Sequence, residues 1–194
     1  MGKLFVDTET TGLPITKNFK YHNPKNTKYY DNARIVEIAY IIYDDNDLKV
    51  KEVTTLIKPS GFIIENSNIH GITTEDAMNN GLDISDVLEE LYDDLFQYSV
   101  NCIIAHNINF DINVILSECY RANKDYLYCS IVKINKECTM HLGKIYLKST
   151  KNPKLNILYE YLFNKEVVQE HRALSDTKIC AECYFKMEIL ETRE

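Results

Sequence analysis

The sequence has no apolar run near the ~20 residues that a membrane-spanning helix needs. Its first residues, Met1-Gly2-Lys3, do not resemble a signal peptide. We therefore expect an intracellular protein, cytoplasmic or nuclear, that is not secreted and has no membrane partner. Internal repeats, low-complexity tracts and long linkers are also missing, so the 194 residues predict a single domain over positions 1–194.

Positive charge is scarce. The chain has 22 Lys and Arg against 29 Asp and Glu, which gives a net charge of −7. This balance disfavours broad, non-specific wrapping of nucleic acid. It is compatible with an enzyme that holds only a few nucleotides, and acids around metal ions would be locally neutralised.

A second cysteine pair is missing as well. Cys180-x-x-Cys183 has the spacing of one of the two ligand pairs of a zinc site, and no second pair follows it. The chain length and the absence of a signal peptide favour free thiols for all six cysteines. A structural or redox role for this pair is the alternative to two buried thiols.

Two segments are basic. Residues 14–33 combine lysines with Phe, Tyr and His, and residues 144–154 contain four lysines and no acid. Lysines beside aromatic rings suit single-stranded nucleic acid, through phosphate contacts and base stacking. Composition alone favours the alternative of solvated surface loops.

The periodicity of apolar residues predicts an α/β fold. Short apolar or β-branched runs predict strands over 4–7, 34–43, 51–58 and 102–105. Apolar residues at helical spacing predict helices over about 84–98, 112–119, 155–162 and 173–190. A strand meander followed by alternating helices and strands indicates a mixed sheet with helices packed on it.

Asp7 and Glu9 are two residues apart at the end of the first strand. Side chains alternate along a strand, so both carboxylates point the same way and repel each other. A hard divalent ion between them would suit such oxygen ligands. A pair of acids at a solvated strand end is the alternative.

Two further segments contain candidate catalytic residues. Asp111 ends His106-Asn107-Ile108-Asn109-Phe110-Asp111, which opens a helix after a strand. His171 and Asp176 are five residues apart and would not share a face of one helix, but His171 could approach Asp176 from a preceding loop. Separately, these residues are equally typical of helix starts and surface positions. Together they predict a two-metal phosphodiesterase site with a histidine base.

The chain resembles the DnaQ-like (DEDD) superfamily of 3′–5′ exonucleases, in its histidine (DEDDh) subgroup. Three segments carry the resemblance in the family's order, and Ile69-His70-Gly71-Ile72-Thr73 resembles a further family segment between the first two. The three segments are Val6-Asp7-Thr8-Glu9-Thr10-Thr11-Gly12-Leu13-Pro14, His106-Asn107 to Phe110-Asp111, and His171-Arg172-Ala173-Leu174-Ser175-Asp176.

The resemblance implies an RNase H-like fold with a central mixed five-stranded sheet, and two bound divalent ions, Mg²⁺ or Mn²⁺. It implies that Asp7, Glu9 and Asp176 hold the first ion. Asp7 would also reach the second, which Asp111 would bind directly or through water. His171 would be the general base. The residues implied to lie near the substrate are Thr8, Thr10, Leu13, His70 and Asn107.

The implied activity is release of nucleoside 5′-monophosphates from the 3′ end of a nucleic acid. DNA is favoured over RNA, although trimming of RNA needs the same residues. No polymerase segment is evident, so any proofreading would be done in trans for a separate DNA polymerase. Some relatives form homodimers. A catalytically silent binding module is disfavoured because all five catalytic positions are intact. Residues 14–33 and 126–152 depart from the shortest family members, and we expect them to influence substrate preference.

Overall fold

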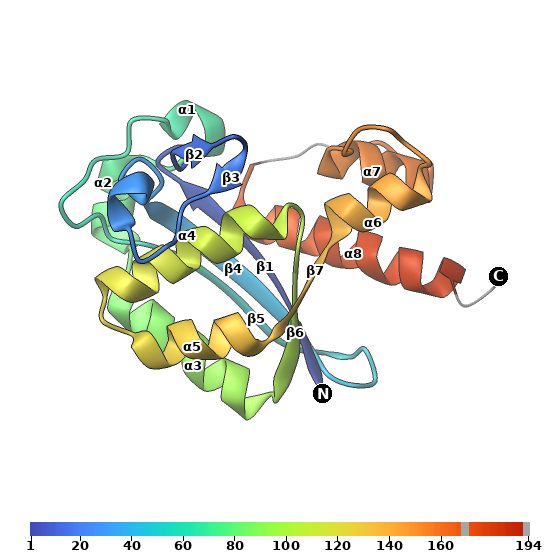
Figure 1. Ribbon diagram of the computed structural model, residues 1–194, viewed down its shortest axis with the longest axis horizontal. Coiled ribbons are helices and arrows are strands. Elements are labelled where there is room, and N and C mark those ends of the chain that lie inside the picture. Colours follow the sequence, from blue (N-terminus) through green and yellow to red (C-terminus); the bar gives the residue numbers. More distant parts are fainter. Residues whose placement is uncertain (168–170, 192–194) are drawn as a thin grey trace.

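The computed structural model describes residues 1–167 and 171–191. Its centre is a five-stranded sheet in the order β5-β4-β1-β6-β7 (Figure 1). The strands are β1 (Gly2–Thr10), β4 (Ile35–Tyr43), β5 (Lys49–Leu56), β6 (Val100–Ala105) and β7 (Asn135–Cys138). β4 is antiparallel to both β1 and β5, whereas β6 is parallel to β1 and to β7. The predicted α/β fold with a mixed five-stranded sheet is confirmed.

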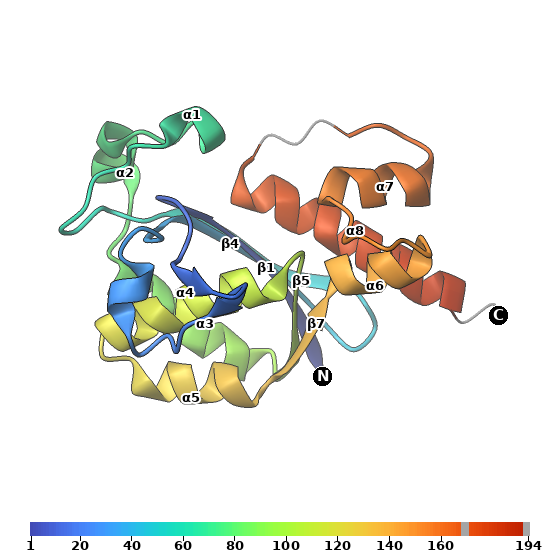
Figure 2. The ribbon, with the colours of Figure 1, turned by 45° about the horizontal axis from the view of Figure 1, so that its top comes forward.

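Helices cover both faces of this sheet, as Figures 1 and 2 show. One layer contains α3 (Ile84–Gln97), α4 (Ile108–Arg121) and α5 (Asp125–Lys133), and the other contains α6 (Thr139–Tyr146), α7 (Leu155–Phe163) and α8 (Ala173–Glu191). Shorter elements lie in the connections: β2 (Thr16–Lys17), β3 (Lys20–Tyr21), the 3-10 helix η1 (Thr27–Tyr30), α1 (Ser67–His70) and α2 (Thr74–Asn80).

The alternation of β1 assigns its side chains to these two layers. Leu4 and Val6 belong to the apolar core under α3 and α4, whereas Phe5 belongs to the core under α7 and α8. By the same alternation, Asp7 and Glu9 point toward the α8 side of the sheet, and Thr8 toward the α4 side. The end of β1 therefore presents two carboxylates to the α8 layer and a threonine to the α4 layer.

β4 is buried along nearly its whole length, because it lies between β1 and β5 under helices. Its Tyr40 hydroxyl donates a hydrogen bond of 2.6 Å to Asp94 of α3. Asp83 caps α3, since its carboxylate accepts a hydrogen bond of 2.7 Å from the Ser85 N–H.

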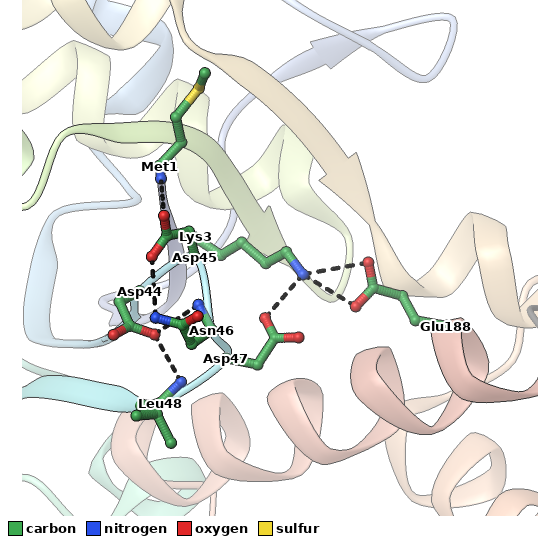
Figure 3. Close-up of polar contacts among 8 residues, drawn as sticks. All are labelled: Met1, Lys3, Asp44, Asp45, Asn46, Asp47, Leu48 and Glu188. Carbon is green, nitrogen blue, oxygen red and sulfur yellow. Dashed lines mark hydrogen bonds and ion pairs between the residues drawn. The ribbon is translucent and has the colours of Figure 1, made fainter.

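Lys3 connects the β4–β5 turn to α8 (Figure 3). Its ammonium lies 3.0 Å from Asp47 and 3.1 Å from Glu188, and above the rings of Tyr184 and Phe185. The turn itself is organised by Asp44, whose carboxylate accepts hydrogen bonds of 2.9 Å from the Asn46 and Leu48 N–H groups. These contacts fix the end of the sheet that is remote from Asp7 and Glu9.

The structure differs from the sequence prediction mainly in polar and short elements. β1 extends past Asp7 to Thr10, and β5 covers 49–56 rather than 51–58. The hairpin β2–β3 and α1, α2, α5, β7 and α6 were not predicted. All six cysteines are free, and Cys180 and Cys183 are buried thiols, as expected. Among the described residues, no helix has the length and apolar character to cross a membrane.

Candidate active site

Three carboxylates meet where β1 ends beside the start of α8. Asp7, Glu9 and Asp176 each offer one oxygen, and these oxygens all lie within 4.8 Å of one another. Asp176 lies in the first turn of α8, the helix on the side of the sheet to which Asp7 and Glu9 point. The structure thus brings together the three residues that the resemblance assigns to one metal ion.

A pocket of about 700 Å³ opens beside these acids. Asp7, Asp176 and His171 line it together, and the opposite wall is the segment 152–156 before and at the start of α7. His171 lies outside the helix, with a positive φ of 48°. The five-residue spacing of His171 and Asp176 is therefore compatible with one pocket.

The acids of the cluster raise one another's pKa values, and the Arg172 guanidinium only partly offsets this at Glu9. Burial, followed by the charges of Asp111, Asp176, Glu9 and Glu37, raises the pKa of Asp7 well above its usual range. Burial and then Asp176 raise the pKa of Glu9 to about 8. Carboxylates that lie this close repel one another when ionised. A hard divalent cation would offset the repulsion and restore their ordinary ionised form.

Asp111 lies on the other side of β1. It is 2% exposed, in the first turn of α4, and its carboxylate accepts hydrogen bonds from the Thr8 N–H at 3.0 Å and the Thr8 hydroxyl at 2.9 Å. Burial raises its pKa to about 7, although the Thr8 hydrogen bonds act to lower it. Asp111 is not among the three acids that share a 4.8 Å cluster, although its charge acts on Asp7.

The residues implied to contact substrate are in different environments. Thr8 is buried against Asp111, and the Thr10 hydroxyl donates a 2.7 Å hydrogen bond to the Gly12 carbonyl. Leu13 is 75% exposed. Asn107 adopts a left-handed conformation directly before α4. Of this set, Leu13 has the exposure that a contact with a terminal base requires.

His70 is 2% exposed and organises a loop. Its Nδ1 accepts a 3.1 Å hydrogen bond from the Ile72 N–H, and its Nε2 lies 3.3 Å from the Asn66 side-chain oxygen. Burial lowers the pKa of His70, so the ring is neutral and Nε2 is the donor to Asn66. Asn66 in turn donates a 2.9 Å hydrogen bond to the Thr10 carbonyl, which links this loop to the end of β1.

Glu37 was not identified from the sequence. It is paired with Glu9 in the β1–β4 register and is 2% exposed. Its carboxylate accepts hydrogen bonds from Arg172 Nε at 3.0 Å, from Arg172 Nη2 at 2.5 Å, and from the Ala173 N–H at 2.9 Å. It therefore fixes the start of α8, two residues after His171. The available signal was an acid in the middle of an apolar strand.

His106 begins the second family-like segment, but the sequence predicted no role for it. Its Nε2 lies 3.1 Å from the Pro153 carbonyl and its Nδ1 3.0 Å from the Thr139 hydroxyl. Burial lowers its pKa to about 4, so the ring is neutral, with Nε2–H donating to Pro153 and Nδ1 accepting from Thr139. His106 thereby attaches the segment before α7 to the end of β6 and forms part of the pocket wall.

Comparisons with known proteins identify relatives in sequence and in fold. The chain is 27% identical over 186 residues to the DNA polymerase III PolC-type of Caldanaerobacter subterraneus subsp. tengcongensis, and 28% identical over 189 residues to that of Bacillus subtilis. Each match covers 93% of this chain but only 11% of the curated relative, so the chain spans about a tenth of the length of these proteins.

Structures of E. coli exonuclease I have the same fold. The complex with a dT13 oligonucleotide matches with a TM-score of 0.73 and 18% identity, and covers 99% of this chain and 42% of that one. The complex with a dA16 oligonucleotide matches with a TM-score of 0.67 and 17% identity, covering 98% and 43%. This confirms the RNase H-like arrangement. The model of the Exonuclease family, RNase_T, matches residues 4–184, so the chain belongs to this family of metal-dependent, DnaQ-like 3′–5′ exonucleases.

Proposed function

We propose that this protein hydrolyses the last phosphodiester bond at the 3′ end of DNA and releases nucleoside 5′-monophosphates. The observation that carries the proposal is the cluster of Asp7, Glu9 and Asp176, whose oxygens lie within 4.8 Å of one another. Two of these acids, Asp7 and Asp176, line one pocket with His171. Substrate specificity for DNA is supported by the relatives, which are DNA polymerases and an exonuclease crystallised with oligodeoxynucleotides.

The residues present fit divalent metal ions. Acids with raised pKa values and converging oxygens are a donor set for Mg²⁺ or Mn²⁺. We propose that Asp7, Glu9 and Asp176 hold one ion, and that Asp7 and Asp111 hold a second, with Asp111 acting through water or after releasing Thr8. Bound ions would neutralise the phosphodiester and acidify an attacking water molecule.

His171 would take the proton from this water molecule. The water oxygen forms a bond to phosphorus while the bond from phosphorus to the 3′-oxygen of the remaining strand breaks. The released nucleotide keeps its 5′-phosphate. The leaving 3′-oxygen takes a proton from solvent, so the strand ends in a new 3′-hydroxyl. Arg172 and Glu37 hold the segment that carries His171, so the base is positioned by a partly buried ion pair on its C-terminal side.

The residues implied to lie near the substrate come from three segments. Thr8 and Thr10 lie in β1 and Leu13 follows it, Asn107 precedes α4, and His70 is linked through Asn66 to the Thr10 carbonyl. We propose that exposed Leu13 packs against the terminal base and that the backbone near Thr10 receives the 3′-hydroxyl. Thr8 and His70 would act indirectly, by holding Asp111 and the loop 66–72.

We also propose that residues 1–194 form one exonuclease domain. The PolC-type relatives contain a matching segment within a polymerase, so a DNA polymerase in trans is the partner that this domain would serve. Mixing the protein with a polymerase that lacks exonuclease activity and scoring misincorporation would test this. Gel filtration with light scattering would test a homodimer.

The experiment for the activity uses 5′-labelled single-stranded DNA and a matched RNA, each with Mg²⁺, Mn²⁺ or EDTA. We expect a metal-dependent ladder that shortens from the 3′ end, faster on DNA. Asp7→Asn should remove it, whereas Asp93→Asn, an exposed acid on α3, should not. A faster ladder on RNA would reassign the substrate, and equal ladders from wild type and Asp7→Asn would refute the assignment of the site.

A further inference from the structure

The hairpin β2–β3 has an unusual residue at its tip. Thr16 pairs with Tyr21 and Lys17 with Lys20, which leaves Asn18 and Phe19 as a two-residue turn. Both turn residues have positive φ, 51° and 60°. Such turns favour Asn at the first position and Gly at the second, because left-handed backbone disfavours other side chains. Phe19 is therefore a poor choice for the turn.

Phe19 contributes nothing to the core either. Its exposure is 101%, so the ring is as accessible as in an extended peptide. An aromatic residue that disfavours its own turn and buries no surface is not explained by folding. Residues that break a local rule without a gain in packing are expected at functional positions.

The charges around Phe19 point to one kind of occupant. Lys17 and Lys20 lie directly across the hairpin, where like charges destabilise the pair. Within 1–167 and 171–191, neither lysine forms an ion pair. In a chain of net charge −7, two unpaired ammonium groups lie beside an exposed ring. The ammonium groups suit the phosphates of a single strand, and the ring suits its bases.

The base of the hairpin is held against the candidate active site. The Tyr21 hydroxyl is close enough to the Asn107 side chain for that amide to act on the Tyr21 pKa, which burial raises. Asn107 precedes α4 and follows pocket-lining His106. The Ile15 N–H donates a 2.8 Å hydrogen bond to the Tyr29 carbonyl. Figures 1 and 2 both show the hairpin alongside α4. Its tip is two residues, or ~7 Å, beyond Tyr21.

We propose that the β2–β3 hairpin binds the substrate strand upstream of its 3′ end, with Phe19 stacked on a base and Lys17 and Lys20 on phosphates. The proposal rests on the proposed function and names a binding element for it. Stacking needs no particular base, so the contact holds any single strand and lets it slide as the end is shortened.

The test is binding of a fluorescent single-stranded 12-mer, measured by anisotropy with Mg²⁺ in an Asp7→Asn background that prevents cleavage. Phe19→Gly should weaken binding roughly 5- to 100-fold while leaving the melting temperature equal or higher, because Gly suits the turn. Phe19→Trp should retain affinity. Phe96→Ala removes another exposed aromatic residue, on α3, and should change affinity less than about twofold.

A second measurement addresses the lysines. In the double variant Lys17→Ala, Lys20→Ala, the slope of log affinity against log salt should become shallower by about 1.4, or ~0.7 per lost phosphate contact. The proposal would be overturned if Phe19→Gly bound DNA within twofold of the parent, or if its melting temperature were lower than that of the parent. The ring would then have a protein partner or a structural role. Wild-type protein that binds through Phe19 yet shows no metal-dependent cleavage would instead refute the proposed function alone.

Discussion

Raising the pH should destabilise the metal-free protein, because acids in the candidate active site prefer their protonated form when folded. The pKa of Glu9 is about 8 in the folded protein against a usual 4.5, and that of Asp111 is about 7 against 3.8. Between these values the folded state binds more protons than the unfolded state. Stability from Glu9 is therefore fully present below about pH 4.5 and is lost as the pH rises to about 8.

The magnitude follows from the same values. Each tenfold change in proton affinity corresponds to about 1.4 kcal/mol, so Glu9 alone would account for on the order of 5 kcal/mol in a fully enclosed site. Glu9 is only partly buried, so solvent screening reduces this to about 2–3 kcal/mol. For a protein of this size, that corresponds to a fall in melting temperature of roughly 4–12 °C.

The assay is thermal unfolding in EDTA from pH 5 to 9, followed by circular dichroism. Glu9→Gln should flatten the slope, whereas Asp93→Asn should leave it unchanged. Saturating Mg²⁺ should raise the melting temperature most at high pH, because ions replace the bound protons. A melting temperature that is constant or rises between pH 5 and 8, or the same slope in Glu9→Gln, would refute the reasoning.

Three further predictions concern single residues. Asp176→Asn should reduce turnover at least about 10²-fold, without lowering the melting temperature in EDTA, because repulsion with Asp7 is relieved; unchanged turnover would contradict the metal assignment. His171→Ala should reduce kcat by roughly 10²- to 10⁴-fold, and steady-state kinetics showing less than a tenfold loss would indicate another base. Glu37→Gln should destabilise the protein by roughly 1–3 kcal/mol in urea unfolding, less than a fully buried pair because Arg172 is 46% exposed, and should lower kcat. Equal stability and kcat would show that Glu37 does not hold the start of α8.

The long, strongly patterned elements were predictable from the sequence. β4 and β6 are rich in apolar residues because both lie inside the sheet, and α3 has a regular apolar stripe with an Asp cap. β7 was not predictable, since it is a four-residue edge strand of sequence Asn-Lys-Glu-Cys that pairs only with β6. Its strand identity comes from a neighbour in space rather than from its own composition.

The candidate site was predictable to the level of residues but not of contacts. Spacing in β1 placed Asp7 and Glu9 on one side, and the structure adds Asp176 to them. Two contacts could not be predicted from the sequence: the hydrogen bonds between Asp111 and Thr8, and the ion pair between Glu37 and Arg172, which are 135 residues apart. Such contacts depend on which helix covers which face of the sheet, a property of the assembled fold.

The most direct test of the central claim is the identity of the first product released from single-stranded DNA that carries its label in the 3′-terminal nucleotide. Wild-type protein with Mg²⁺ should release labelled nucleoside 5′-monophosphate as its first product, and Asp7→Asn should release none. A labelled 3′-monophosphate, a labelled oligonucleotide, or undiminished release by Asp7→Asn would contradict the account.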